Sequence, residues 1–211
     1  MLVEKVEVLI RPGFTENCYI VRSKDIPKEV IVIDPGAQAN LIIERLNGRA
    51  LDRIVLTHRH YDHIGAVDEL VEKTGARVLA HTIDAEALRN QIGIGPAVVS
   101  RMVKPLNVDD MLEDGDVIVV GNSQLEVLNT PGHTAGSICL YNKDEHILFA
   151  GDTMFFEAVG RTDLPGGNAM QQKASIKRLF LLPDKTRVYP GHDAETTIGH
   201  EKSWGPMAYR V

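Results

Sequence analysis

The sequence predicts an α/β protein folded as a four-layer αββα sandwich, with two β-sheets packed face to face between outer helices. Strand-like and helix-like segments alternate along the 211 residues. Two stretches also share one order of elements. VIVIDPG (30–36) leads through a helix-like segment to RIVLTH (53–58), and HILFAGD (146–152) leads through another to RVYPGH (187–192). This repetition indicates two similar halves whose polar strand ends meet at one edge, where open α/β folds bind ligands.

The first half contains short β-rich runs bounded by Pro-Gly pairs or charged residues, as strands commonly are. We expect these strands at residues 3–10, 17–22, 30–34, 53–56 and 77–80. Residues 38–46 and 64–73 have the apolar spacing of helices, and Thr74-Gly75 closes the second. Asp84 opens a further helix-like stretch. The glycines and prolines of residues 91–107 predict a long irregular segment that could cover a site.

The second half repeats the pattern of short strands followed by helices. Its strands are expected at residues 117–120, 124–128, 137–141, 147–150 and 187–189. Residues 169–182 are predicted to form a helix that breaks at Pro183, and residues 195–202 to form a short final helix. The helices of the two halves would supply the outer layers of the sandwich.

Length and composition limit the kinds of protein this can be. The length predicts one domain over residues 1–211. A net charge of −6 argues against a nucleic-acid partner, because that binding depends on cationic contacts to phosphate. No apolar run is long enough to span a membrane, and the N-terminus alternates like a strand and does not resemble a signal peptide. Cys18 and Cys139 are expected to be buried free thiols, so we predict a cytoplasmic protein.

Candidate metal ligands are concentrated in THRHYDH (57–63), which directly follows an apolar run. Imidazole nitrogen and carboxylate oxygen are ligands of metals of the zinc type. In an extended loop alternate residues face the same way. His58 and His60 could therefore bind one ion together, while Asp62 and His63 reach a second ion nearby.

Three later stretches offer further ligands. TPGHTAGS, FAGDT and YPGHD each place one ligand-type side chain beside glycine after an apolar strand, namely His133, Asp152 and His192. Because strand ends meet at one edge, these side chains could complete the two coordination shells that the short loop only half fills.

The order THxHxDH, GHT, GDT and GH resembles that of the metallo-β-lactamase superfamily, and within it the glyoxalase II branch, over residues 17–201. This resemblance implies the αββα fold of that family and two divalent metal ions, zinc in first place with iron or manganese as alternatives. The ligand set that it implies is His58, His60 and His133 for the first ion, Asp62, His63 and His192 for the second, and Asp152 as the bridge. Asp62 would also be catalytic, because it can orient the hydroxide.

The resemblance further implies hydrolysis of a small-molecule thioester such as S-lactoylglutathione, by a metal-bridging hydroxide that attacks the thioester carbonyl. The chain ends at Val211, so it resembles compact forms without a C-terminal helical domain. The alternative is a mononuclear iron persulfide dioxygenase of the same fold, with His58, His133 and Asp152 as iron ligands. β-Lactam hydrolysis is disfavoured because no cysteine lies near the ligand motifs.

Several neighbouring residues have two interpretations each. Arg161, in GRTDLPGG, is in the position where the resemblance implies substrate binding, by contact with a carboxylate, but it could equally pair with Asp163. Asp34 either supports a metal-binding histidine or forms a turn. Arg59 and Tyr61 would face away from the ligands, at the entrance of the site or in solvent.

Overall fold

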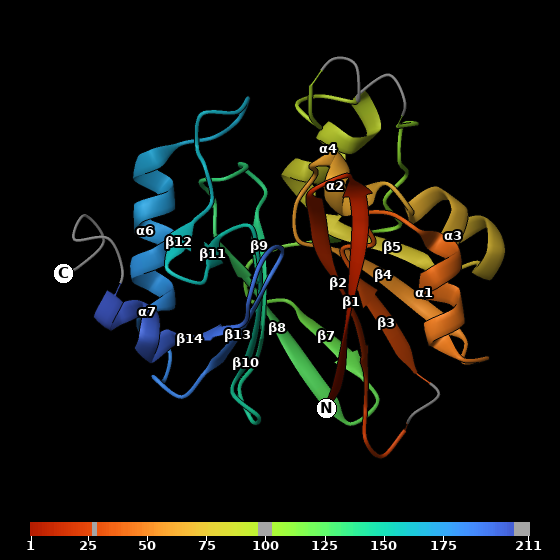
Figure 1. Ribbon diagram of the computed structural model, residues 1–211, viewed down its shortest axis with the longest axis horizontal. Helices are drawn as coiled ribbons and strands as arrows, with labels where there is room; N and C mark the ends of the chain where they lie inside the picture. The colour runs from red at the N-terminus through yellow and green to blue at the C-terminus, as the bar shows by residue number, and fades with distance from the viewer. Residues whose placement is uncertain (27–28, 97–102, 205–211) are drawn as a thin grey trace.

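The computed structural model describes residues 1–26, 29–96 and 103–204, and within them two six-stranded sheets face each other (Figure 1). The first sheet has the strand order β1-β2-β3-β4-β5-β6, with antiparallel pairing from β1 to β3 and parallel pairing from β3 to β6. Its strands are β1 (Leu2–Arg11), β2 (Phe14–Arg22), β3 (Val30–Ile33), β4 (Leu51–Leu56), β5 (Arg77–His81) and β6 (Asp110–Leu112).

The second sheet has the order β14-β13-β10-β9-β8-β7, and only its β10–β13 pair is parallel. Its strands are β7 (Val117–Val120), β8 (Ser123–Asn129), β9 (Ile138–Asn142), β10 (Ile147–Gly151), β13 (Arg187–Pro190) and β14 (Thr196–Thr197). A small separate hairpin is formed by β11 (Met154–Phe155) and β12 (Ala158–Val159).

Helices cover the outer face of each sheet, which confirms the predicted four-layer arrangement. The helices beside the first sheet are α1 (Ala39–Leu46), α2 (Tyr61–Ile64), α3 (Val67–Thr74) and α4 (Thr82–Asn90). The second sheet is covered by α6 (Ala169–Leu179) and α7 (Ile198–Trp204), on the opposite side of the molecule (Figure 1). Among the described residues, none of the helices has the length and hydrophobicity that crossing a bilayer requires.

Apolar side chains fill all three spaces between the four layers. In β3 the alternation of strand side chains sends Val30 and Val32 toward the helices, and Ile31 and Ile33 toward the other sheet. A third cluster lies between the second sheet and the helices α6 and α7. Because both faces of each sheet are covered, its inner strands read as continuous apolar runs and not as alternating ones.

The two halves repeat one unit of strand, helix and parallel strand. In the first half, β3 leads through α1 to its parallel neighbour β4, and in the second half β10 leads through α6 to its parallel neighbour β13. These are the pairs that the repeated sequence order predicts. Since parallel strands end at the same edge, the polar residues that follow all four strands come together there.

The structure differs from the prediction mainly at short elements and element ends. The helix expected at residues 64–73 begins only at Val67, as α3, because the Ala66 amide donates to the Pro35 carbonyl (3.0 Å) and the chain turns after the short helix α2. The helix expected at 169–182 ends at Leu179, and the final helix begins only at Ile198. The strands β6, β11, β12 and β14 were not predicted, since two or three residues show no periodicity.

The long irregular segment expected at residues 91–107 is described only in part. Residues 91–96 and 103–107 contain no helix or strand, whereas residues 97–102 lie outside the described part of the chain. Ile94 is buried and its carbonyl accepts a hydrogen bond from the Tyr61 amide (2.7 Å). The segment therefore packs against the loop that carries the first candidate ligands.

Candidate metal centre

The loop after β4 carries four of the candidate ligands, and the way it ends in a helix decides how they point. His58 follows the end of β4, and His60 has extended backbone angles (φ −67°, ψ 147°) just before α2. Asp62 and His63 lie in the single turn of α2 itself. All four side chains are buried, so the loop turns its polar groups inward to a common centre.

The first set consists of His58, His60 and His133, whose candidate ligand atoms all lie within 4.8 Å of one another. His60 Nδ1 and His133 Nε2 are 2.8 Å apart. His133 Nδ1 lies 2.8 Å from the carbonyl oxygen of Arg161. A carbonyl only accepts, so this nitrogen is the donor, and the other ring nitrogen of a neutral imidazole turns its lone pair to the set.

The second set consists of Asp62, His63 and His192, again within 4.8 Å. His63 Nδ1 faces Asp34 Oδ2 (3.1 Å), and His192 Nδ1 faces the Thr15 carbonyl (2.7 Å). Both Nδ1 atoms are therefore donors. The two Nε2 atoms face each other at 3.3 Å and lie beside the carboxylates of Asp152 and Asp62. Such an arrangement favours a cation between them.

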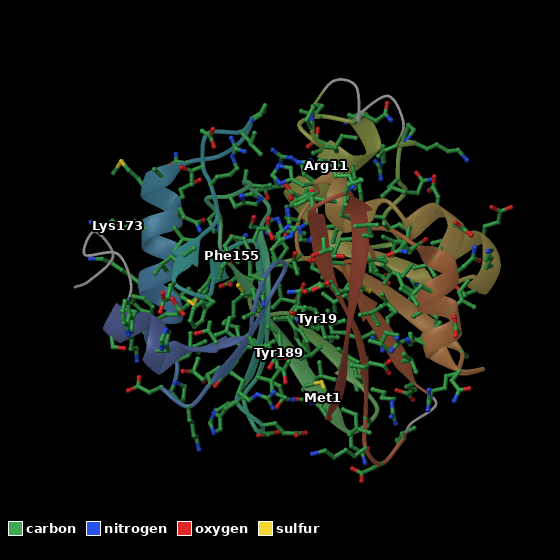
Figure 2. All side chains as sticks on the ribbon, in the orientation of Figure 1. Met1, Arg11, Tyr19, Phe155, Lys173 and Tyr189 are labelled. Carbon is green, nitrogen blue, oxygen red and sulfur yellow. The ribbon has the colours of Figure 1, made fainter. Side chains whose placement is uncertain are left out.

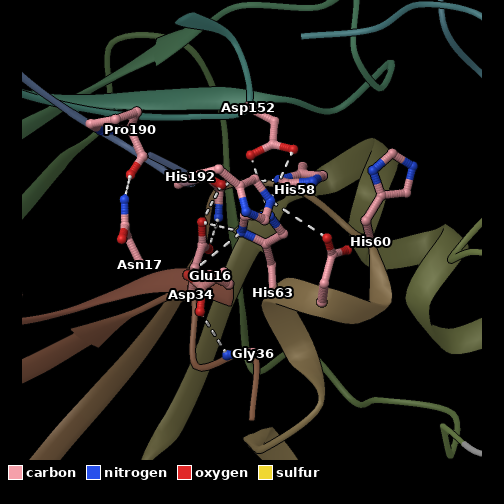
Figure 3. A network of polar contacts seen from close by, with 12 residues as sticks. Glu16, Asn17, Asp34, Gly36, His58, His60, His63, Asp152, Pro190 and His192 are labelled. Carbon is pink, nitrogen blue, oxygen red and sulfur yellow. Dashed lines mark hydrogen bonds and ion pairs between the residues drawn. The ribbon is translucent and has the colours of Figure 1, made fainter. Parts of the chain in front are cut away.

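Asp152, which follows β10 in the other sheet, joins the two sets (Figure 3). Its Oδ1 is 3.3 Å from His63 Nε2, and its Oδ2 is 3.4 Å from His133 Nε2 and 3.7 Å from His192 Nε2. One carboxylate thus reaches ligands of both sets. The structure brings the side chains of all seven predicted ligand residues together, and a third cluster of Asp34, His58 and His63 overlaps the two sets.

Burial and neighbouring charges separate the pKa values of the histidines. Burial lowers the pKa of His58 well below the ordinary value and that of His60 to about 3, so these rings are neutral and keep a free lone pair. Burial acts the same way on His63 and His192, but nearby carboxylates outweigh it and raise both pKa values. Burial would raise the pKa of Asp152, yet the histidines hold it well below its usual range.

Several buried atoms of this centre have no hydrogen-bond partner. Their chemistry indicates whether these residues suit metal ions. His58 Nε2, His60 Nε2 and Asp152 Oδ1 are unpartnered. Buried polar atoms are nearly always satisfied, so such a group needs an explanation. Neutral imidazoles and an ionised carboxylate are the donors that zinc-type ions take. The donor set therefore fits divalent metal ions.

Two acidic side chains lie beside the Nδ1 atom of His63, and Asp34 is the one that hydrogen-bonds it. Both oxygens of Asp34 are in use, because Oδ1 accepts from the Thr57 amide (2.7 Å) and Oδ2 accepts from the Thr57 hydroxyl and from His63. Asp34 therefore holds His63 in place, its carboxylate lies within ligand distance of His58 and His63, and its left-handed backbone (φ 49°) also makes the turn. Glu16 lies 3.8 Å from His63 Nδ1, and burial raises its pKa well above the usual range. The role of Glu16 was not predicted, since β2 gives no such signal.

Glycine lets the second sheet approach the centre closely. A side chain at Gly191 would collide with Asp152 Oδ1 and with the His63 ring. The Gly191 amide donates to the Gly151 carbonyl (2.9 Å), and its own carbonyl accepts from the Asn17 amide (2.8 Å). These contacts fix the backbone that carries His192, which explains why glycine precedes this ligand.

The buried carboxylate of Asp84, at the start of α4, ties two ligand loops together. It accepts hydrogen bonds from the backbone and guanidinium of Arg59 (3.0 and 2.7 Å), from the Thr134 hydroxyl (2.7 Å) and from the Gly136 amide (3.1 Å). Arg59 is thus buried in an ion pair, and the prediction of a residue at the entrance or in solvent is wrong. Its guanidinium also donates to the Pro165 carbonyl (2.8 Å).

Arg161 forms the second of its two predicted interactions. Its guanidinium donates from Nε and Nη2 to the two oxygens of Asp163, both at 2.7 Å, and its side chain is 62% exposed. The backbone of Arg161 has a separate role, because its carbonyl accepts from His133. Contact with a substrate stays a prediction.

Comparison with known proteins gives the same family as the ligand motifs. The profile of the metallo-beta-lactamase superfamily matches residues 11–192. An uncharacterized protein of Aquifex aeolicus is 41% identical over 193 residues, covering 91% of both chains. The hydroxyacylglutathione hydrolase GloC of Haemophilus influenzae is 31% identical over 211 residues, covering 96% of this chain and 97% of its own.

Solved structures are similar over nearly the whole chain. The BLEG-1 B3 metallo-beta-lactamase has a TM-score of 0.84 at 33% identity, covering 98% of this chain and 99% of that one. The di-iron-bound form of TTHA1623 has a TM-score of 0.82 at 34% identity, covering 96% and 98%. ETHE1 from Myxococcus xanthus has a TM-score of 0.76 at 29% identity, covering 99% and 85%. This chain belongs to the metallo-β-lactamase superfamily.

Proposed function

We propose that this protein is a binuclear metal-dependent hydrolase of thioesters such as S-lactoylglutathione. The observation that carries the proposal is the pair of adjacent ligand sets joined by Asp152. When bound, two divalent ions of the zinc type, or of iron or manganese, would supply a hydroxide near neutral pH and polarise the carbonyl of the substrate. Membership of a family with metallo-hydrolases supports the coarser claim of a hydrolase.

The side chains of the centre have distinct tasks in such a reaction. Asp62 Oδ2 lies 3.5 Å from His192 Nε2. Burial would raise the pKa of Asp62, but the contact with His192 lowers it, so the carboxylate is ionised and can accept a hydrogen bond from the attacking water. His133 and His192 are held in one tautomer by the Arg161 and Thr15 carbonyls. The rings are therefore oriented before substrate arrives.

Thioester chemistry suits a centre that has no separate acid for the leaving group. A thiol has a pKa of about 8.5, so the thiolate departs without prior protonation. The relative named hydroxyacylglutathione hydrolase supports glutathione as the thiol carrier. We propose the cytoplasm as the compartment, because Cys18 and Cys139 are free thiols and such thiols persist in reducing surroundings. The proposed partner is thus the small-molecule thioester alone, with neither nucleic acid nor membrane.

The alternative is a mononuclear iron persulfide dioxygenase that uses His58, His133 and Asp152. The di-iron-bound neighbour favours keeping iron among the candidate metals. The LPGG and TTIG segments of the sequence favour the hydrolase over this alternative. In the hydrolase, the second set of Asp62, His63 and His192 would bind the second ion.

Two assays run side by side on the same preparation test the proposed function. One measures thiol release from S-lactoylglutathione, and the other measures oxygen uptake with glutathione persulfide. We expect thiol release without oxygen uptake. Oxygen uptake without thiol release would contradict the hydrolase and support the dioxygenase. A separate measurement of β-lactam ring opening by the same preparation distinguishes thioester hydrolysis from the activity in the name of the BLEG-1 neighbour.

Arg161 pairs with Asp163, and we propose that it leaves Asp163 to bind a carboxylate of the substrate instead. Arg161→Ala should then raise KM for S-lactoylglutathione about tenfold, with much less effect on a neutral thioester, because the lost contact is remote from the reacting carbonyl. Asp163→Ala is the matched variant. It frees the guanidinium and should lower the same KM. Steady-state kinetics with both substrates measures this, and equal effects on both would mean that the pair only shapes its loop.

A further inference from the structure

The hairpin between β1 and β2 reaches the metal centre with an aromatic ring. The pairing of β1 with β2 is irregular between Leu9 and Arg11, and such a bulge redirects the side chains beyond it. The Leu9 amide donates to Gln38 Oε1 (2.6 Å), which fixes the irregular stretch to the residue before α1. Gly13 has a positive φ of 75° and closes the turn. The turn residues therefore have a defined direction.

Phe14, the first residue of β2, stacks on the candidate ligand His192. The ring centroids are 5.0 Å apart and the rings are inclined by 21°. Phe155 of β11 lies 6.0 Å from the same imidazole. His192 is thus in contact with two aromatic rings, one from each half of the fold.

Arg11 contacts the same phenylalanine. Its guanidinium carbon lies 5.2 Å from the centroid of the Phe14 ring, within the range of a cation–π interaction. Arg11 is exposed, and Figure 2 shows it at the end of the β1–β2 hairpin. The Arg11 guanidinium thus contacts Phe14, and Phe14 in turn contacts the candidate ligand His192.

The charge of Arg11 is free to meet a ligand, in contrast to the other arginines of the site. Arg59 is paired with Asp84 and Arg161 with Asp163. In the part of the chain that the structure describes, Arg11 has neither an ion pair nor a hydrogen bond from its guanidinium, and the Phe14 ring is its recorded partner. A guanidinium keeps five donors for a planar anion while its face rests on an aromatic ring.

We propose that Arg11, supported by Phe14, is a subsite for a carboxylate on the thiol half of the substrate. The proposal rests on the proposed thioester hydrolysis, since it names the part of that substrate which the hairpin recognises. The ring of Phe14 contacts both Arg11 and the candidate ligand His192. Arg11 would therefore contact a group of the substrate that is remote from the scissile carbonyl. A remote contact is equally strong in the ground state and the transition state, and it therefore acts on KM and leaves kcat unchanged.

The test compares S-lactoylglutathione with its diethyl ester, which has the same skeleton without the carboxylate charges. Arg11→Ala should raise KM for the acid about tenfold, with kcat and the KM for the ester unchanged. Arg11→Lys keeps the charge without the planar fork and should recover part of the loss. Arg45→Ala is the matched control, because it removes one exposed positive charge on α1, where the side chain pairs with Glu4. We expect no change in that variant.

A binding measurement separates this subsite from the proposed reaction. Calorimetry with S-methylglutathione, which cannot be hydrolysed, should give a dissociation constant about tenfold higher for metal-loaded Arg11→Ala than for the wild type. That difference would support the subsite even if the wild type failed to hydrolyse thioesters. The proposal is overturned if S-methylglutathione binds both proteins equally, or if KM rises equally for the acid and the ester.

Discussion

Replacement of Asp152 by alanine should abolish thioester hydrolysis and weaken metal binding at both ligand sets. Its two oxygens lie 3.3 and 3.4 Å from His63 and His133, one in each set, so a single substitution damages both. A metal centre supplies several kcal/mol of transition-state stabilisation. Loss of about 4 kcal/mol corresponds to a fall in kcat of roughly a thousandfold. We expect the decrease in metal affinity to exceed the roughly 10–100-fold that follows loss of an outer supporting group.

Activity and metal content of the same Asp152→Ala preparation measure this effect. Asp110→Ala is a suitable control, because this carboxylate is exposed on β6 and pairs with Arg77. It should keep full activity and full metal content. Near-normal hydrolysis by Asp152→Ala with unchanged metal content would mean that the carboxylate does not join the two sets.

The second large effect is expected on stability, from Asp84→Asn. The asparagine leaves the buried Arg59 guanidinium without its ionic partner and turns an amide toward groups that are themselves donors. Breaking one side of a buried ion pair costs about 3–5 kcal/mol of the free energy of unfolding. Because Asp84 connects the loop of His58 with the loop of His133, metal affinity should fall as well.

Asp114→Asn provides the comparison, since the same substitution there breaks an ion pair with Arg178 whose two side chains are 49% and 40% exposed. An exposed pair contributes no more than about 1 kcal/mol. Urea unfolding of both variants at saturating metal gives the two free energies. If Asp84→Asn costs no more than Asp114→Asn, the buried carboxylate does not hold the loops.

The ligands were predictable because chemistry restricts both the type of residue and its place. A histidine or aspartate next to glycine at the end of an apolar strand has few other reasons to recur three times, after a fourth strand that ends in THRHYDH. The strand–helix–strand repeat then predicts that β4, β10 and β13 end at one edge. The fold class follows from the same pattern and is confirmed by the two sheets and their outer helices.

The residues that support the ligands are harder to predict, because their contacts join positions that lie far apart in the sequence. Asp84 lies 50 residues from Thr134 along the chain, yet the two share a hydrogen bond. Glu16 lies in β2 and contacts His63 only through the fold. The burial of Arg59 is not predictable from its own loop, because its partner Asp84 lies 25 residues further along the chain and meets it only in the fold.

Counting the metal ions per chain tests the central claim most directly. The centre contains two ligand sets of three residues each, with Asp152 between them. Metal-depleted protein is titrated with zinc, iron or manganese, and bound metal and thioester hydrolysis are measured at each addition. We predict that activity reaches its maximum at two divalent ions per chain. Saturation at a single tightly bound iron, with no second ion bound and no thioester hydrolysed, would contradict the account.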